Sequence, residues 1–289
     1  MAGSLDGIRV LDLGSFVSCP FCGMLLADLG AEVIRVEKPT GGEDRFLGLL
    51  TSSGDSYSFV NPNRNKKGVS LNFNNEKGRH ILNELVKRSD VVLENLSPNL
   101  VKITGIKYTN FKAIKPDIIY ARVTAFGPTG PYRHRIAFDR IARAMSGAIS
   151  ISGFPDNPCC EQTYYVDYGT ASLTAVGVLA ALYHRERTGQ GQLIDTSLLQ
   201  TGVTYMAPFI GEWETGKVSR KRIGNRGYWY GPYDVYETKD GRRVFLGAVT
   251  DPVWKSFCSV RMISDTSSLL FVFLSPTHPG SSLKKSQSF

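Results

Sequence analysis

The amino-acid sequence predicts an α/β protein with a doubly wound parallel sheet, followed by the start of a smaller α+β unit. Two observations support this prediction. The chain opens with a strand-like run at Ile8–Leu13, a short helical stretch at Met24–Leu29 and a second strand-like run at Glu32–Glu37. Together these form a βαβ unit, which implies parallel strands. Beyond residue 226 the pattern changes to a hairpin that turns at Asp240-Gly241.

The remaining elements of the predicted sheet follow in chain order. Apolar runs bounded by turn residues predict four further strands, at Val69–Phe73, Val91–Leu96, Ile118–Val123 and Gln192–Ser197. Helical spacing of apolar residues predicts helices at Glu76–Arg88, Phe138–Ser146 and Ala171–Tyr183. Alternating strands and helices of this kind favour one large layered domain.

Changes in composition divide the chain into four predicted parts. Residues 1–212 form the large domain, the polar and basic residues 213–226 a linker, and residues 227–260 part of a small domain. Residues 261–289 contain eight serines and one isolated apolar run. We interpret this segment as a divergent, disordered tail, of the kind that a frameshift or alternative splice produces; an ordinary flexible terminus is the alternative.

Composition narrows the class of protein and of partner. The chain has 289 residues and a net charge of +8, which favours an acidic partner such as a phosphorylated small molecule. The basic residues are dispersed, so nucleic acid is not expected. The five cysteines are too few and too scattered for a disulfide framework, which favours a reducing compartment. We expect a cytoplasmic protein, with mitochondrial or peroxisomal placement as alternatives.

No targeting or membrane segment is expected. The N-terminus has no basic and apolar leader pattern. The longest predicted apolar helix, Ala171–Tyr183, is too short to span a bilayer.

The sequence gives little support to thiol redox chemistry, to a zinc site, or to dinucleotide-binding and hydrolase motifs. Cys19 and Cys22 form a C-x-x-C pair between a strand and a helix, where a redox site would stand, but two small residues packing a tight turn is the favoured interpretation. The adjacent Cys159 and Cys160 have poor geometry for zinc, and no metal site is expected. No G-x-G-x-x-G, no G-x-S-x-G and no nucleophile beside a histidine is present.

Asp167 is the candidate reactive residue. It stands at the start of a helix built of small and apolar residues, where unpaired backbone N–H groups stabilise negative charge. From these residues alone, a carboxylate that merely caps the helix is the favoured interpretation. Basic and amide residues after predicted strands suggest a phosphate-bearing ligand; these are Lys38, the Asn63–Lys66 segment, Asn95 and Lys102.

Several blocks in order resemble the class III CoA-transferases, the family of formyl-CoA transferase and carnitine CoA-transferase. The blocks are Leu11–Leu13, Leu26–Glu37, Asn63–Lys67, Glu94–Asn95, Ala125–Tyr132, Ala144–Gly147 and Val166–Asp167. The resemblance runs from about Gly7 to about Val260. It stops there, so the chain resembles a family member that ends early and carries a divergent tail.

The resemblance implies a Rossmann-like large domain, a smaller domain and an interlocked homodimer. It also implies acyl-CoA and a small carboxylic acid as substrates, with no permanently bound cofactor. Asp167 falls on the family's aspartate, which attacks the acyl-CoA to form a mixed anhydride and later an aspartyl-CoA thioester. A carboxylate with an ordinary pKa of about 4 would need no base for this attack.

The resemblance also assigns the residues around Asp167. Phe16 and Val17 fall near the acyl and thioester end. Because the oxyanion on the thioester carbonyl needs stabilisation, the backbone N–H groups near Gly169 and Thr170 are candidate donors to it. The residues that fall on CoA-binding loops are Phe16, Lys38, Asn63, Arg64, Asn65, Lys66, Asn95, Leu96, Ser97 and Lys102.

Two departures from the family pattern bear on which reaction the chain would catalyse. Gly227–Gly231 lacks a glycine-rich lid, which disfavours formyl transfer. Phe138 stands where the related α-methylacyl-CoA racemases place a histidine, so racemisation lacks its second acid–base group. A racemase and an inactive, truncated CoA-binding chain are the alternatives to a CoA-transferase.

Overall fold

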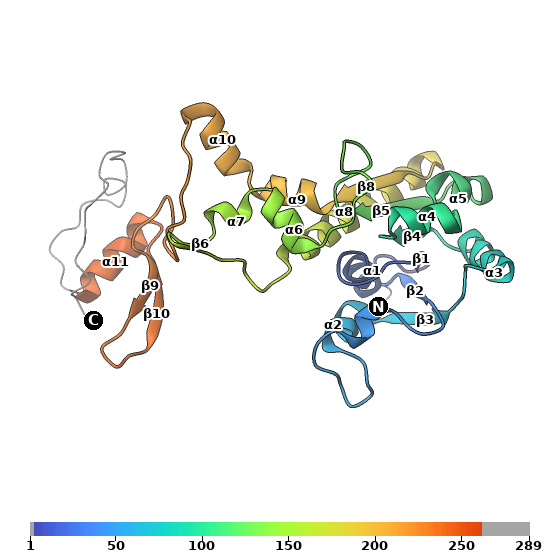
Figure 1. Cartoon of the computed structure of the whole chain (residues 1–289), viewed down its shortest axis with the longest axis horizontal. Coiled ribbons are helices and arrows are strands. Elements are labelled where there is room, and N and C mark those ends of the chain that lie inside the picture. The colour runs from blue at the N-terminus through green and yellow to red at the C-terminus, as the bar shows by residue number, and fades with distance from the viewer. Residues whose placement is uncertain (1–2, 262–289) are drawn as a thin grey trace. The chain divides into compact units, whose positions relative to one another are not determined.

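A six-stranded parallel sheet forms the centre of the structure. The computed structural model describes residues 3–261. The strand order is β3-β2-β1-β4-β5-β8, and every neighbouring pair is parallel (Figure 1). The strands are β1 Arg9–Asp12, β2 Glu32–Glu37, β3 Lys66–Ser70, β4 Val91–Glu94, β5 Ile119–Thr124 and β8 Leu193–Ser197. The predicted α/β class is therefore confirmed.

Helices connect these strands and extend beyond them. They are α1 Ser18–Asp28, α2 Tyr57–Val60, α3 Glu76–Lys87, α4 Pro98–Thr104, α5 Tyr108–Ile114, α6 Asp139–Met145, α7 Ala148–Ile151, α8 Tyr165–Thr188, α9 Leu198–Tyr205, α10 Ala207–Gly216 and α11 Asp251–Arg261. Short 3₁₀ turns lie at Glu43–Phe46 and Asn61–Asn63.

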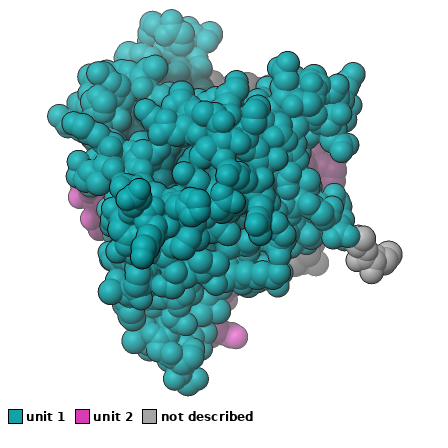
Figure 2. Space-filling view, turned by 90° about the vertical axis from the view of Figure 1, so that its right-hand side faces the viewer, with its two compact units in different colours: residues 1–148, 161–218 teal, residues 149–160, 219–289 magenta. Residues whose placement is uncertain are grey.

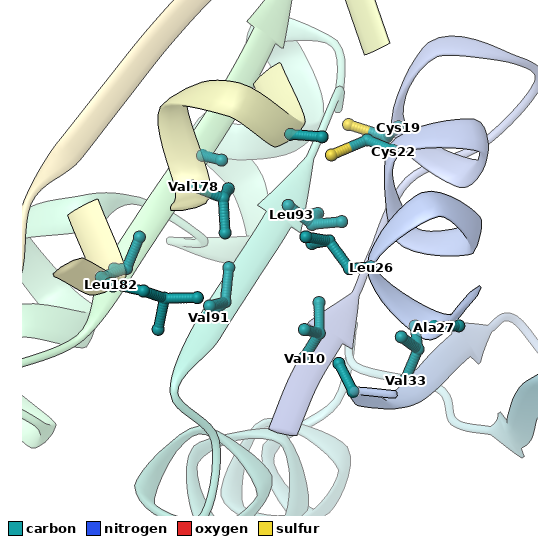
Figure 3. Close-up of a cluster of buried hydrophobic side chains, with 14 of the residues drawn as sticks. Val10, Cys19, Cys22, Leu26, Ala27, Val33, Val91, Leu93, Val178 and Leu182 are labelled. Carbon is teal, nitrogen blue, oxygen red and sulfur yellow. The ribbon is translucent and has the colours of Figure 1, made fainter. Parts of the chain in front are cut away.

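Two apolar clusters cover the two faces of the sheet. On one face, α1 and α8 pack against β1, β2, β4 and β5. Figure 3 shows side chains of these two helices around Val10, Val91 and Leu93 of the sheet. On the other face, Leu82 and Val86 of α3 and Phe111 of α5 pack against a second cluster. Helices on both faces are the defining feature of a doubly wound sheet.

Helix α8 is longer than predicted. It spans 24 residues, from Tyr165 to Thr188, whereas its apolar part alone was expected at Ala171–Tyr183. Among the described residues it is the one helix long and apolar enough to cross a membrane, judged by length and composition alone. The prediction that it is too short was wrong. Half of its most apolar 18-residue segment is buried in the protein, as in a helix that packs in the core of a folded domain. The helix ends at Gly189, which has the left-handed conformation with φ 70°.

Three further predicted boundaries differ from the structure. Strand β3 begins at Lys66, three residues before the prediction, because it is an edge strand whose exposed residues carry no clear apolar alternation. Helix α1 begins at Ser18 rather than Met24. The first part of the predicted linker is helical, since α10 extends to Gly216.

The chain divides into two compact units, which Figure 2 colours separately. The first contains residues 1–148 and 161–218, and the second contains residues 149–160 with the part of the chain after 218. Residues 149–160 therefore leave the predicted range 1–212 and join the second unit. There the guanidinium of Arg222 donates hydrogen bonds to the carbonyls of Ser150, Phe154 and Pro155.

The second unit contains the predicted hairpin. Strands β9 Tyr233–Glu237 and β10 Arg243–Gly247 pair antiparallel, and Gly241 turns between them with φ 77°, which confirms the hairpin. A further short pair, β6 Gly153–Phe154 with β7 Asn157–Pro158, was not predicted. The expectation for the tail concerns residues 261–289, of which 262–289 lie outside the described residues.

Candidate active site

Asp167 lies in a cavity of about 510 Å³ within the first unit. The cavity is lined by the loop after β1, the segment after β2, helix α2, the N-terminal half of α6 and the start of α8. The lining residues are Phe16, Val17, Asp44, Leu47, Gly48, Ser58, Phe138, Asp139, Arg140, Ile141, Tyr164 and Asp167. The structure thus brings Asp167 together with Phe16 and Val17, as the resemblance implied.

The side chain that caps α8 is Asp139, not Asp167. Oδ2 of Asp139 accepts hydrogen bonds from the backbone N–H groups of Val166 at 2.9 Å and of Asp167 at 3.2 Å. These are two of the N–H groups that a helix start leaves unpaired. Because Asp139 satisfies them, the carboxyl group of Asp167 is not needed as a cap.

Burial changes the acidity of Asp167. Loss of hydration and, to a smaller extent, the negative charge of Asp139 raise the pKa of this carboxyl group from 3.8 to about 7, although hydrogen bonding with Ser18 opposes part of the rise. The expectation of an ordinary pKa near 4 was therefore wrong. A group with this pKa is about half ionised at neutral pH.

Arg143 holds Asp139 in place. Its guanidinium is fully buried and lies 3.0 Å from Oδ1 of Asp139. It also donates to the carbonyls of Glu161 and Thr163, which lead into α8, and lies over the ring of Tyr165. One buried cation therefore connects α6 with the chain that enters α8.

The loop before α1, which contains Phe16, forms part of the cavity wall. Phe16 has a positive φ of 63°, its N–H donates to Oδ2 of Asp44 at 3.0 Å, and its ring packs edge-on against Phe138. Val17 and Ser18 stand at the start of α1, which has no side-chain cap, and the N–H groups of a helix's first turn have no partner within the helix.

Gly169 and Thr170 have structural roles in α8. They lie in its second turn, where backbone N–H groups point to the helix's own carbonyls, so the structure differs from the prediction that they bind an oxyanion. A Cβ atom on Gly169 would lie 1.9 Å from Oη of Tyr205. The hydroxyl of Thr170 bonds the carbonyl of Val166 at 2.7 Å and the hydroxyl of Thr201 at 2.8 Å.

Two residues predicted to bind CoA lie inside the fold. The ammonium of Lys66 is buried and donates to Oδ2 of Asp12 at 2.8 Å, the carbonyl of Pro20 at 2.7 Å and Oδ1 of Asn63 at 3.0 Å. All three of its protons are thereby used. The same Asn63 oxygen accepts from Arg35 at 2.9 Å. The Asn63–Lys66 segment leads into β3 instead of following a strand, which corrects the prediction.

Arg64 and Asn65 lie beside this buried pair but on the surface. Arg64 is paired with Asp28. The amide of Asn65 donates to the same carboxylate at 2.7 Å.

The other predicted CoA-binding residues lie near the carboxyl ends of strands. Lys38 follows β2, is exposed and pairs with Glu43. Asn95 follows β4 and exchanges hydrogen bonds of 2.8 and 2.9 Å with the backbone of Ser15, which fixes the loop that carries Phe16.

Leu96, Ser97 and Lys102 continue from Asn95. The N–H of Leu96 donates to Glu94, and the hydroxyl of Ser97 caps α4. Lys102 is exposed on α4.

The cysteines support the structural interpretation. Cys19 and Cys22 are fully buried in the core, and burial raises the pKa of both thiols. Protonated, inaccessible thiols are poor redox groups, so packing is their role. In the described chain no group of three or more possible metal ligands occurs.

Sequence reasoning missed Asp139, Arg140, Arg143, Asp44 and Ser18. Asp139 and Arg143 stand four residues apart in a predicted helix, a spacing that brings side chains together. This spacing could have predicted the pair of Asp139 and Arg143. The hydrogen bonds from α8 to Asp139 could not be predicted, because they join residues far apart in the sequence.

Comparison with known proteins assigns the fold to a family. The model of CoA-transferase family III matches residues 5–267. The chain is 37% identical over 252 residues to a succinyl-CoA–D-citramalate CoA-transferase of Chloroflexus aurantiacus, covering 86% of this chain and 63% of that protein. It is 36% identical over 258 residues to a mouse succinyl-CoA:glutarate CoA-transferase, covering 89% and 59%. The chain thus spans about three-fifths of these relatives.

Solved structures agree with this relationship. A CAIB/BAIF family protein from Brucella suis matches with a TM-score of 0.82 and 31% identity, covering 91% of this chain and 71% of that one. Rv3272 from Mycobacterium tuberculosis matches with a TM-score of 0.77 and 30% identity, covering 90% and 69%.

Proposed function

Because this chain belongs to CoA-transferase family III, we propose that it moves coenzyme A from an acyl-CoA to a carboxylic acid, with Asp167 as the nucleophile. One observation carries the proposal. Asp139 caps α8, which leaves the carboxyl group of Asp167 available in a cavity large enough for an acyl group. The relatives whose names specify succinyl-CoA, and one that specifies acetyl-CoA and oxalate, favour small acids as substrates.

The reaction proceeds by four acyl transfers at Asp167. A carboxylate oxygen attacks the thioester carbonyl, the C–S bond breaks, and CoA leaves as a thiolate. The thiolate attacks the aspartyl carbonyl of the resulting anhydride, which releases the first acid as its carboxylate. The acceptor carboxylate then attacks the aspartyl-CoA thioester and releases the thiolate again. Attack of that thiolate on the new acyl carbonyl restores the Asp167 carboxylate.

The start of α1 is suited to stabilise the oxyanion in these steps. The N–H groups of Val17 and Ser18 lie at the start of α1, which has no side-chain cap, and Val17 lines the same cavity as Asp167. Unpaired N–H groups at a helix start carry partial positive charge. We assign the oxyanion to these groups in place of Gly169 and Thr170.

The electrostatics of Asp167 also affect its rate. Only the ionised carboxylate attacks, and its pKa is about 7. We therefore expect the rate of anhydride formation to rise about tenfold between pH 5.5 and pH 6.5 and to level off above pH 7.5.

Trapping the intermediate tests the proposal. The protein is incubated with an acyl-CoA and then with hydroxylamine, which converts an activated aspartyl group into a hydroxamate that mass spectrometry locates. We expect the label on Asp167 and its loss in Asp167→Asn. A wild-type chain that stays unlabelled, while it binds acyl-CoA, would support the alternative of an inactive CoA-binding chain.

No observation favours the racemase alternative. Phe138 lines the cavity beside Asp139, and its ring carries no proton that a substrate carbon could exchange. Deuterium incorporation at the α-carbon of an acyl-CoA in the absence of any acceptor acid would reverse this conclusion.

A further inference from the structure

Arg140 is the only cationic side chain among the described residues that line the cavity. Three carboxyl groups share that lining. Two of them are balanced by buried arginines, since Asp44 pairs with Arg35 at 2.8 Å and Asp139 pairs with Arg143 at 3.0 Å. The third is Asp167. The charges of Asp44 and Asp139 are therefore matched by arginines other than Arg140.

Arg140 itself has no acidic partner within residues 3–261. Its one hydrogen bond joins Nη2 to Oε1 of Gln162 at 2.7 Å, and this neutral acceptor leaves the positive charge uncompensated. The side chain is exposed, so the charge lies at the solvent-facing part of the cavity. Most of the planar guanidinium's donors thus remain available to a ligand.

Chemistry at Asp167 makes this charge more important. When Asp167 becomes an anhydride or a thioester, its own negative charge disappears, and Arg140 becomes the dominant charge facing the bound acyl group. An acyl chain that ends in a methyl group would place carbon beside an unpaired cation. A chain that ends in a carboxylate would form a charge-assisted, two-pronged pair with the guanidinium.

We infer that Arg140 selects acyl groups and acceptor acids that carry a second carboxylate, by binding that carboxylate at the mouth of the cavity. The inference rests on the proposed function, because it assigns the substrate class of the same site. It makes Arg140 a specificity-determining residue, whereas Asp167 is the nucleophile.

Binding of two matched thioesters tests the inference. Succinyl-CoA and butyryl-CoA have the same number of acyl carbons and differ in a terminal carboxylate or methyl group. Their affinities are measured by titration calorimetry on the full chain in an Asp167→Asn background, where no acyl transfer changes the ligand. We expect succinyl-CoA to bind at least about 10-fold more tightly.

Variants at two arginines separate the specific effect from a general one. In Arg140→Gln the preference for succinyl-CoA should disappear while butyryl-CoA binds as before, and Arg140→Lys should keep part of the preference. Arg187→Gln is the matched control, because Arg187 is an exposed arginine near the far end of α8. It should leave both affinities unchanged.

Three results would overturn the inference: equal affinity for the two thioesters, an equal loss of both in Arg140→Gln, which would mean that Arg140 contacts CoA itself, or no binding of either thioester. The hydroxamate experiment on Asp167 tests the proposed function separately, with the wild-type residue in place. A labelled Asp167 without a succinyl preference would refute the role of Arg140 alone. A succinyl preference without label would refute the transfer chemistry alone.

Discussion

Asp167 makes the stability of the folded chain depend on pH. Its carboxyl group has a pKa of about 7 in the folded state, against 3.8 when unperturbed. Between these values the folded state holds a proton that the unfolded state has lost. The resulting stabilisation is complete below about pH 4 and is lost as the pH rises through 7. The negative charge of the buried Asp167 therefore opposes folding at neutral pH.

Replacing Asp167 by asparagine should remove this opposition. At pH 8 we expect Asp167→Asn to be more stable than the wild type by on the order of 4 kcal/mol, and at pH 4 the two should be nearly equal. Urea unfolding at both pH values measures the difference. Glu94, whose pKa also rises to about 7, is present in both proteins and cancels. A pH-independent difference would show that burial does not shift the acidity of Asp167.

Gly169 allows Tyr205 to approach α8. A Cβ atom there would lie 1.9 Å from Oη of Tyr205, so we expect Gly169→Ala to lower the free energy of unfolding by about 1–3 kcal/mol. In a Tyr205→Ala background the same change should stabilise the helix by roughly 0.5–1 kcal/mol, as alanine normally does. Thermal or urea unfolding of the four proteins measures this coupling.

Gly211→Ala provides the control for that cycle. It lies in α10 with open space at its Cβ position and should be stabilising in either background. Equal effects of Gly169→Ala with and without Tyr205 would contradict the steric role.

At the scale of elements, α6 builds the start of α8. Asp139 and Arg143 are both on α6, and together they bind the first N–H groups of α8 and the chain that enters it. The geometry at Asp167 is therefore set by a helix that begins 28 residues earlier in the sequence. If α8 were capped by a side chain of its own, α6 and α8 would not be linked in this way.

Asp139→Asn should weaken this link. It leaves the buried guanidinium of Arg143 with less compensating charge, so we expect a loss of about 3 kcal/mol of stability. It also removes one cause of the raised pKa of Asp167, so the midpoint of the pH–rate profile should move to lower pH. Asp195→Asn, in a half-exposed pair with Arg122, should cost about 1 kcal/mol or less and leave the midpoint in place.

Elements with buried, apolar residues could be predicted closely from the sequence. Strand β2 lies where Glu32–Glu37 indicated, because its alternation reports a half-buried strand. Strand β3 was misplaced because an edge strand held by Lys66 has no such alternation. The apolar pattern covers only the middle of helix α8, because its first turns contain Gly169 and two tyrosine residues, which are weak helix formers.

At the scale of the whole molecule, the sequence predicted the sheet, and it singled out Phe16, Val17 and Asp167, which line one cavity; the role of Asp167 as nucleophile stays a prediction. The sequence could not predict the buried ion pairs. The pairs of Asp12 with Lys66 and of Asp139 with Arg143 join residues whose partners depend on the finished fold. For that reason Lys66 was interpreted as a CoA ligand and Asp139 was overlooked. The homodimer implied by family resemblance stays a prediction, which light scattering of the purified chain would test.

The labelling rate of the buried cysteines reports local opening of the folded protein. Cys19 and Cys22 lie in the core between α1 and the sheet, whereas Cys159 is exposed. A thiol reagent should label Cys159 at once and the two core thiols roughly 1000-fold more slowly or less readily still, at a rate set by the opening of α1. Peptide-level mass spectrometry follows each site, and fast labelling of Cys19 would contradict the packing described for α1. The ratio of the two rates measures how often α1, which begins beside the cavity that contains Asp167, opens in the folded protein.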